Sequence, residues 1–148
     1  MTIFVDADAF PNVLKEILLR FVMKRGISTR FIANKRIAIP DVSFISMEIA
    51  PQGADEADHL IAFTCKAGDL VITADIPLAD RIVSKGAIGL DPRGTIYTQE
   101  NIKGLLVMRN LMQELRDGGE ITGGPSAIGE KEKRAFADAL NALLQKLK

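Results

Sequence analysis

The sequence contains no tryptophan, and among its 148 residues it has only one tyrosine, one cysteine and one histidine. Cys65 alone cannot form an internal disulfide, and no charged segment followed by an apolar one opens the chain, which favours a cytoplasmic protein. Few of the seven phenylalanines fall outside predicted core positions. No aromatic platform for stacking nucleobases is therefore apparent.

The chain also lacks excess charge and long hydrophobic runs. Its 19 basic and 19 acidic side chains cancel, so no overall field attracts nucleic acid, and a phosphate site needs a local patch or a bound cation. No apolar stretch approaches the roughly 18 residues that span a bilayer, which argues against a membrane partner. The length and the 47% hydrophobic content fit one soluble domain, residues 1–148. They leave the oligomeric state open.

Short apolar runs alternate with helical patterns along the chain. The runs predict strands at 3–5, 29–33, 44–49, 70–73 and 87–90. The patterns predict helices at 11–25, 55–66, 77–85, 98–116 and 130–146. This order is typical of an α/β fold. A glycine-rich segment at about 118–129 precedes the last helix, and it is either a connector or a loop whose N–H groups approach a phosphate.

Aspartates gather where such a fold forms its ligand crevice. Each lies just after an apolar run or in the first turns of a predicted helix, so the acids should meet at the carboxyl ends of the strands. The candidate metal ligands are Asp6, Asp8, Asp55, Asp58, Asp75 and Asp80. Ordinary roles exist for single members, because Asp55 suits a helix N-terminus and Asp75 can cap the helix that Pro77 starts.

Converging carboxylates suit a hard cation such as Mg²⁺, which prefers oxygen ligands. In phosphodiester hydrolysis such an ion activates a water and stabilises the leaving oxygen. Two carboxylates ~4 Å apart repel each other by about 4 kcal/mol at an effective dielectric constant of 20, so one tends to keep its proton without a metal. The cluster should therefore lose affinity for divalent ions in mild acid.

Three acid motifs resemble those of PIN-domain nucleases: Asp6 after the first strand, Asp58-His59-Leu60-Ile61-Ala62, and Thr73-Ala74-Asp75. Longer strings resemble the YaiI/YqxD family of uncharacterised bacterial proteins over nearly the whole chain. These strings are Val5-Asp6-Ala7-Asp8-Ala9, Gly53-Ala54-Asp55-Glu56-Ala57-Asp58, the segment 68–79, Asp91-Pro92-Arg93-Gly94 and Gly123-Gly124-Pro125.

The resemblance implies a PIN-like three-layer α/β/α fold with a mainly parallel central sheet. It also implies a ribonuclease site that uses Mg²⁺ or Mn²⁺, with Asp6, Asp58 and Asp75 at the catalytic acid positions and Asp80 as a looser match to a fourth. Asp8 belongs to the narrower family pattern, as does Asp55, either as a ligand or as a support for the ligands. Phe10 departs from that pattern, because family members often carry a cysteine before the proline.

Basic residues supply candidate contacts to an RNA or other phosphodiester substrate. Arg93 lies in a predicted turn within a family-like string, and Arg30, Lys35 and Arg36 could flank the crevice. His59 is a weak candidate for catalysis. Neighbouring residues on a helix diverge by about 100°, so His59 and Asp58 would not bind the same metal ion.

Three functions remain open at this point. A metal-dependent nuclease, acting on RNA, accounts for the largest number of acids. A phosphatase with an aspartate nucleophile would use Asp6 and Asp8, but Phe10 departs from its usual motif and Asp58 has no task there. A non-catalytic module that binds RNA or protein on a PIN-like scaffold is the third function.

Overall fold

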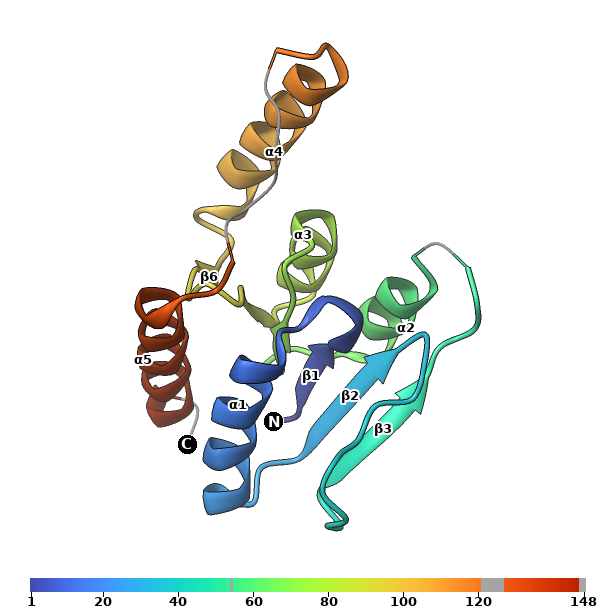
Figure 1. Cartoon of the computed structure of the whole chain (residues 1–148), viewed down its shortest axis with the longest axis vertical. Coiled ribbons are helices and arrows are strands. Elements are labelled where there is room, and N and C mark those ends of the chain that lie inside the picture. The colour runs from blue at the N-terminus through green and yellow to red at the C-terminus, as the bar shows by residue number, and fades with distance from the viewer. Residues whose placement is uncertain (54, 121–126, 147–148) are drawn as a thin grey trace.

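A six-stranded sheet forms the centre of the protein in the computed structural model, which describes residues 1–53, 55–120 and 127–146. The strands are β1 (Ile3–Asp6), β2 (Thr29–Ala33), β3 (Ile45–Ile49), β4 (Leu70–Ile72), β5 (Ile88–Leu90) and β6 (Ile96–Tyr97). Their order across the sheet is β3-β2-β1-β4-β5-β6 (Figure 1). The first five strands pair in parallel and β6 pairs antiparallel with β5. The predicted α/β class and mainly parallel sheet are confirmed, while the two-residue β6 was not predicted.

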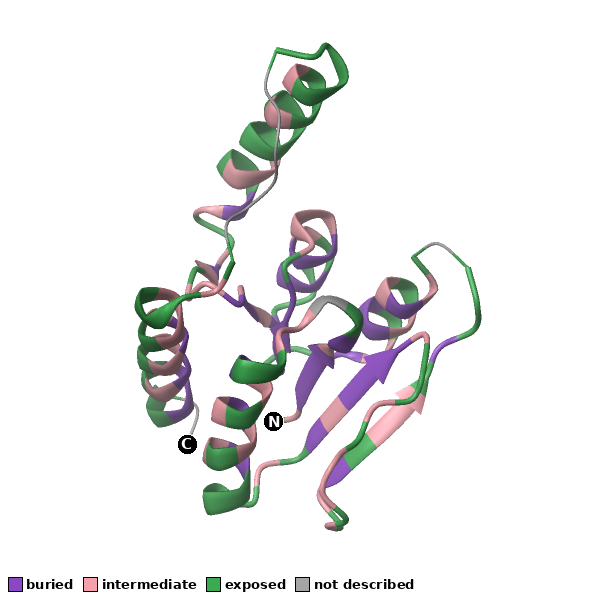
Figure 2. Cartoon of the chain, viewed as in Figure 1, coloured by how far each residue is buried: buried purple, intermediate pink, exposed green. Residues whose placement is uncertain are grey.

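Helices cover both faces of this sheet because successive strand residues point to opposite sides. In β1, Ile3 and Val5 pack with α1 (Asn12–Arg25) and α5 (Glu130–Lys146), whereas Phe4 packs on the opposite face with α2 (Glu56–Thr64) and α3 (Ile76–Ser84). Figure 2 shows β1 and β2 as largely buried, whereas the edge strand β3 is mostly intermediate or exposed. The arrangement is the predicted three-layer α/β/α fold.

Helix α4 (Ile102–Asp117) extends away from the sheet (Figure 1). The expected apolar stripe is present, but only Ile102 is buried, and Val107 is 68% exposed. The helix begins later than predicted, because a turn precedes it in which Thr98 N–H donates to the Asn101 side chain. No helix within the described ranges is both long and apolar enough to cross a membrane. Residues 123–125 of the glycine-rich segment lie outside those ranges.

The strand order reverses between β1 and β4. The chain adds β2 and β3 on one side of β1 and then returns to build β4 and β5 on the other side. In open parallel sheets such a reversal leaves a crevice outside the carboxyl ends of the two central strands, and ligands bind there. Asp6 ends β1, and Thr73 and Asp75 follow β4. The fold therefore delivers these residues to the crevice.

At the opposite end of the same two strands, Asp69 joins the chain segments that enter them. Its carboxylate accepts the N–H groups of Thr2 at 2.9 Å and of Lys66 at 2.8 Å. We expect Asp69→Ala to lower the free energy of unfolding by roughly 2 kcal/mol, because two backbone donors lose their acceptor in a site from which water is largely excluded. Urea denaturation measures the loss, with Asp138→Ala on an exposed face of α5 as the control. Equal losses in the two variants would contradict this role for Asp69.

Candidate metal centre

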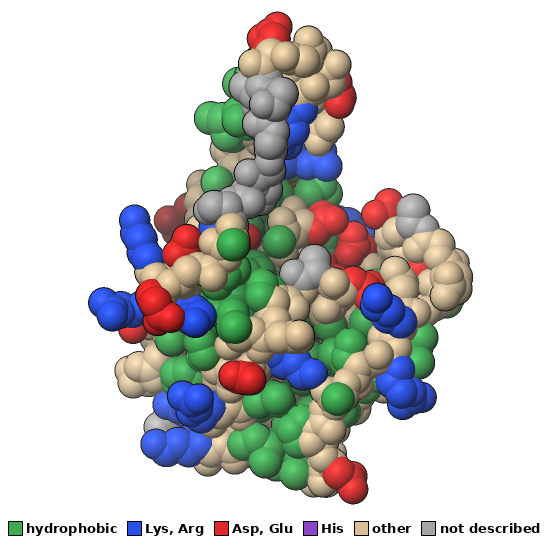
Figure 3. Space-filling model, viewed as in Figure 1, with side chains coloured by type: hydrophobic (Ala, Val, Ile, Leu, Met, Phe, Trp, Pro, Cys, Tyr) green, Lys and Arg blue, Asp and Glu red, His purple; other side chains and the backbone are tan. Residues whose placement is uncertain are grey.

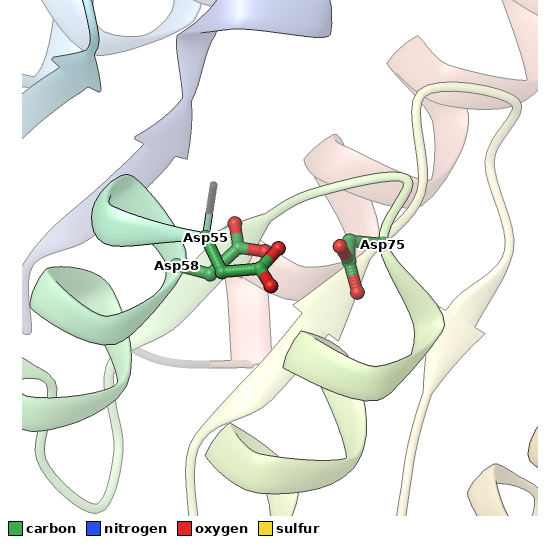
Figure 4. Close-up of side chains that lie close together, drawn as sticks. All are labelled: Asp55, Asp58 and Asp75. Carbon is green, nitrogen blue, oxygen red and sulfur yellow. The ribbon is translucent and has the colours of Figure 1, made fainter. Parts of the chain in front are cut away.

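Three carboxylates meet at the crevice. One ligand oxygen from each of Asp55, Asp58 and Asp75 lies within 4.8 Å of the others. In Figure 4 the first two project from the start of α2 toward Asp75, which lies between β4 and α3. Asp75 lies 17 residues after Asp58 in the sequence, so the fold rather than local chain geometry brings it to the two acids at the start of α2.

Local backbone geometry fixes two of these acids. Asp55 precedes α2 in the left-handed conformation, with a φ of 64°, and its side chain does not cap the helix. Aspartate tolerates this conformation better than most residues. Asp75 does cap its helix, because its Oδ1 accepts the N–H of Leu78 at 2.9 Å. The capping role considered for Asp75 is thus present, and it leaves Oδ2 unused by the cap.

Asp6 supports this arrangement from the end of β1. Its Oδ2 accepts the hydroxyl of Thr73 at 2.8 Å, and the same hydroxyl oxygen accepts the backbone N–H of Asp75 at 3.0 Å. Burial raises the pKa of Asp6, as do the charges of Asp75 and Asp8, while the hydrogen bond from Thr73 lowers it. Asp6 is therefore coupled electrostatically to the cluster and connected through Thr73 to the segment that carries Asp75.

Asp58 is an acid whose charge is disfavoured by its surroundings. Burial raises its pKa to about 7, and a hydrogen bond with Asp75 and the charges of Asp75, Asp6 and Asp55 raise it further. No ion pair in the described part of the chain involves Asp55, Asp58 or Asp75. A proton on Asp58 or a bound cation can relieve this repulsion. The donor set of carboxylate oxygens suits a hard divalent cation.

Comparison with known proteins identifies the family. Residues 4–146 match the family described as "Uncharacterized BCR, YaiI/YqxD family". The chain belongs to this family. Proteins named "UPF0178 protein" are similar over nearly their whole length. The one from Sulfurovum sp. is 56% identical over 99% of each chain. The one from Maridesulfovibrio salexigens is 52% identical over 97% of this chain and 95% of its own. No solved structure matches the chain.

Two of the predicted ligands in this YaiI/YqxD protein have other partners. Both oxygens of Asp8 lie 3.0 Å from the backbone N of Asn34, whose N–H they accept, so Asp8 links the ends of β1 and β2. Asp80 accepts the ammonium of Lys103 at 2.8 Å. Neither belongs to the group of three that could share one ion. The match over residues 4–146 confirms the predicted resemblance to the YaiI/YqxD family. The role of each acid remains a prediction.

Two of the four basic residues predicted to bind substrate have partners within the fold. Arg30 forms an ion pair with Glu48 and lies over the ring of Phe4. Arg93 lies 3.6 Å from the carboxylate of Glu132, in the turn that the sequence predicted. Lys35 and Arg36 are exposed after β2. Within the described residues, none of these four side chains lines the acid pocket around Asp55, Asp58 and Asp75. Their role in binding substrate stays a prediction.

Two other arginines line the acid pocket. Arg81 reaches it from α3 and Arg109 from α4, together with Pro77, Leu78 and the three acids. The sequence could have pointed to Arg81. It lies four residues after Pro77, and so on the same face of the helix that Asp75 caps. No local pattern points to Arg109, since packing between α3 and α4 decides its position. Figure 3 shows acidic side chains gathered between α4 and the loop that leads into α2.

Proposed function

We propose that this protein is a divalent-metal-dependent nuclease that hydrolyses phosphodiester bonds in RNA, with Mg²⁺ or Mn²⁺ as its cofactor. The observation that carries the proposal is the meeting of Asp55, Asp58 and Asp75 at the switch point of the sheet. Burial, together with the neighbouring acids, raises the pKa of Asp58, and a cation at this position would offset the cost of its charge. The resemblance of the acid motifs to PIN-domain nucleases supports RNA as the substrate.

Each nearby side chain has a task in this proposal. Asp58, Asp75 and Asp55 would hold the cation, and Asp6 would keep Asp75 in place through Thr73. A bound divalent ion would lower the pKa of a coordinated water and stabilise negative charge on the departing oxygen. Two arginines that line the pocket, Arg81 and Arg109, would attract the phosphate and offset its charge beside the acids.

The variant Asp75→Asn tests the cation site without removing the helix cap, because an asparagine side chain also accepts the N–H of Leu78. We expect Mn²⁺ affinity, measured by calorimetry, to fall at least about tenfold, and metal-dependent cleavage of single-stranded RNA to disappear. The matched control is Asp138→Asn, which removes one exposed carboxylate on α5. It should retain both properties.

Three outcomes would each reject the proposal. If Mn²⁺ does not bind to folded wild type, or if Asp75→Asn binds it as tightly as wild type does, the acid cluster is not the cation site. If RNA binds equally with and without metal and is never cleaved, a non-catalytic binding module is the better description.

A further inference from the structure

A groove beside the acid pocket contains the most exposed large apolar side chain of the described residues. Phe63, near the C-terminal end of α2, is 87% exposed. The groove is lined by Pro51, Glu56, His59, Leu60, Phe63 and Arg81. Two of these residues, His59 and Arg81, also line the acid pocket, and Arg81 Nη1 lies 3.0 Å from His59 Nδ1. The groove and the acid pocket therefore share one wall.

The course of α2 sets the spacing between the two depressions. Asp58 and Phe63 are five residues apart on this helix, which corresponds to about 7.5 Å along its axis. A nucleotide next to a phosphate at the acid pocket can cover this distance. Five residues also turn the helix by about 140°, so the acid and the ring lie on different sides of α2. The surface between them runs over His59 and Arg81, which line both depressions.

Positive charge lies near the C-terminal half of α2. The ammonium of Lys85 donates to the backbone carbonyl oxygens of Ala62 at 2.7 Å and Phe63 at 3.2 Å, so it lies at the C-terminal end of α2. Arg81 lies one helical turn before Lys85 along α3. Glu56 is the one acid that lines the groove, and it lies two turns before Phe63 on α2. The phosphates of a bound strand would therefore lie along the wall of the groove that α3 forms, away from Glu56.

Isolated exposed apolar residues are common on protein surfaces. Phe63 differs because it shares a groove with Leu60 and Pro51, and because Arg81 lines both this groove and the acid pocket. We propose that Phe63 is a stacking platform for an unpaired nucleobase of a single-stranded nucleic acid whose neighbouring phosphate occupies the acid pocket. This inference rests on the proposed nuclease function and adds a subsite to it.

The preference for a single strand follows from the exposed ring. Bases inside a duplex are stacked on their neighbours and offer no free face, whereas an unpaired base can lie on an aromatic side chain while cations follow the backbone. The sequence indicated no such platform, because Phe63 lies among the apolar residues of its helix and only packing shows which of them remain uncovered.

The absence of tryptophan from the chain makes a direct test possible. In Phe63→Trp the new indole is the sole tryptophan, and a base stacked on it should quench its fluorescence. The probe is a single-stranded adenylate oligonucleotide of about eight nucleotides, with phosphorothioate linkages that resist cleavage. It is added with Mg²⁺ so that the acid pocket can accept a phosphate. The control fluorophore is Val107→Trp, on an exposed position of α4 that lines neither depression.

We expect quenching in Phe63→Trp and none in Val107→Trp, and we expect an abasic oligonucleotide to quench neither. Phe63→Ala should bind the oligonucleotide about tenfold more weakly than wild type, while its Mn²⁺ affinity stays unchanged. Quenching by the abasic chain, or unchanged binding in Phe63→Ala, would overturn the stacking role. If that variant still cleaves RNA with Mn²⁺, the nuclease proposal stands without the subsite. If wild type binds no oligonucleotide at all, the subsite is rejected whatever the metal affinity.

Discussion

Asp58→Asn is expected to make the metal-free protein more stable at pH 8 and, in the same protein, to remove metal-dependent cleavage. The pKa of Asp58 is about 7 in the folded protein, well above the usual range of an aspartate in an unfolded chain. A group with a raised pKa stabilises the fold fully below its unfolded pKa, and this contribution is lost as the pH rises through the folded pKa. At pH 8 wild type therefore holds a costly charge that asparagine lacks.

The size of this effect follows from the shift. Each pKa unit corresponds to about 1.4 kcal/mol, and partial exposure to water reduces the full value, so we expect a gain of roughly 1–3 kcal/mol at pH 8 and less than half of that gain at pH 5, which is still above the unfolded pKa. Urea denaturation in the presence of a chelator measures it at both values. Asp138→Asn, which changes an exposed acid, controls for general charge effects. Parallel pH dependence in wild type and Asp58→Asn would show that this carboxyl is not crowded.

Added Mn²⁺ should reverse the order of stability at pH 8. An ion that binds only the folded state stabilises it more as its affinity rises, and Asp58→Asn has lost one of the three carboxylate charges that would hold the ion. Wild type should also lose Mn²⁺ affinity as the pH falls from 8 to 5.5, because protons compete for Asp58. Cleavage in Asp58→Asn should fall by at least about a hundredfold, since the ion would no longer be held for activation of water. Retained cleavage would remove Asp58 from the site.

Gly94→Ala is expected to destabilise the protein by about 3 kcal/mol. Gly94 ends the turn that follows β5 and has a φ of 99°, a conformation that residues with a side chain rarely adopt. A Cβ there would lie 2.8 Å from the backbone C and O of Ala135 in α5. The substitution therefore combines backbone strain with overpacking against a helix that covers one face of the sheet.

A matched control lies in α4. Gly104 has an ordinary helical conformation, and a Cβ there would meet nothing within 4 Å. Gly104→Ala should raise the free energy of unfolding by roughly 0.5–1 kcal/mol, because alanine loses less conformational freedom in a helix than glycine does. Urea denaturation compares the two variants. If Gly94→Ala is as stable as wild type, the close approach of α5 to this turn is not required for the fold.

The sequence predicted the order of elements because each depends on local patterns. Apolar runs of three to six residues became β1 to β5, and Pro77 with Gly86 bounded α3 as expected. The gathering of acids at one edge was also predictable, since the carboxyl ends of parallel strands share that edge. The short β6 was missed because two residues are too few to show the alternating pattern of a strand. The exposure of α4 was missed because its apolar stripe is typical of a buried helix.

Sequence by itself therefore determined the family, the α/β class and the edge of the sheet where the acids collect. Tertiary structure decided which acids meet. It turned Asp80 toward Lys103 and Asp8 toward Asn34, and it brought Asp55 and Asp58 to Asp75. It also decided that the cations lining the acid pocket come from α3 and α4. The reason is that periodicity fixes the direction of a side chain relative to its own helix or strand. The distance and rotation between elements depend on how their faces pack.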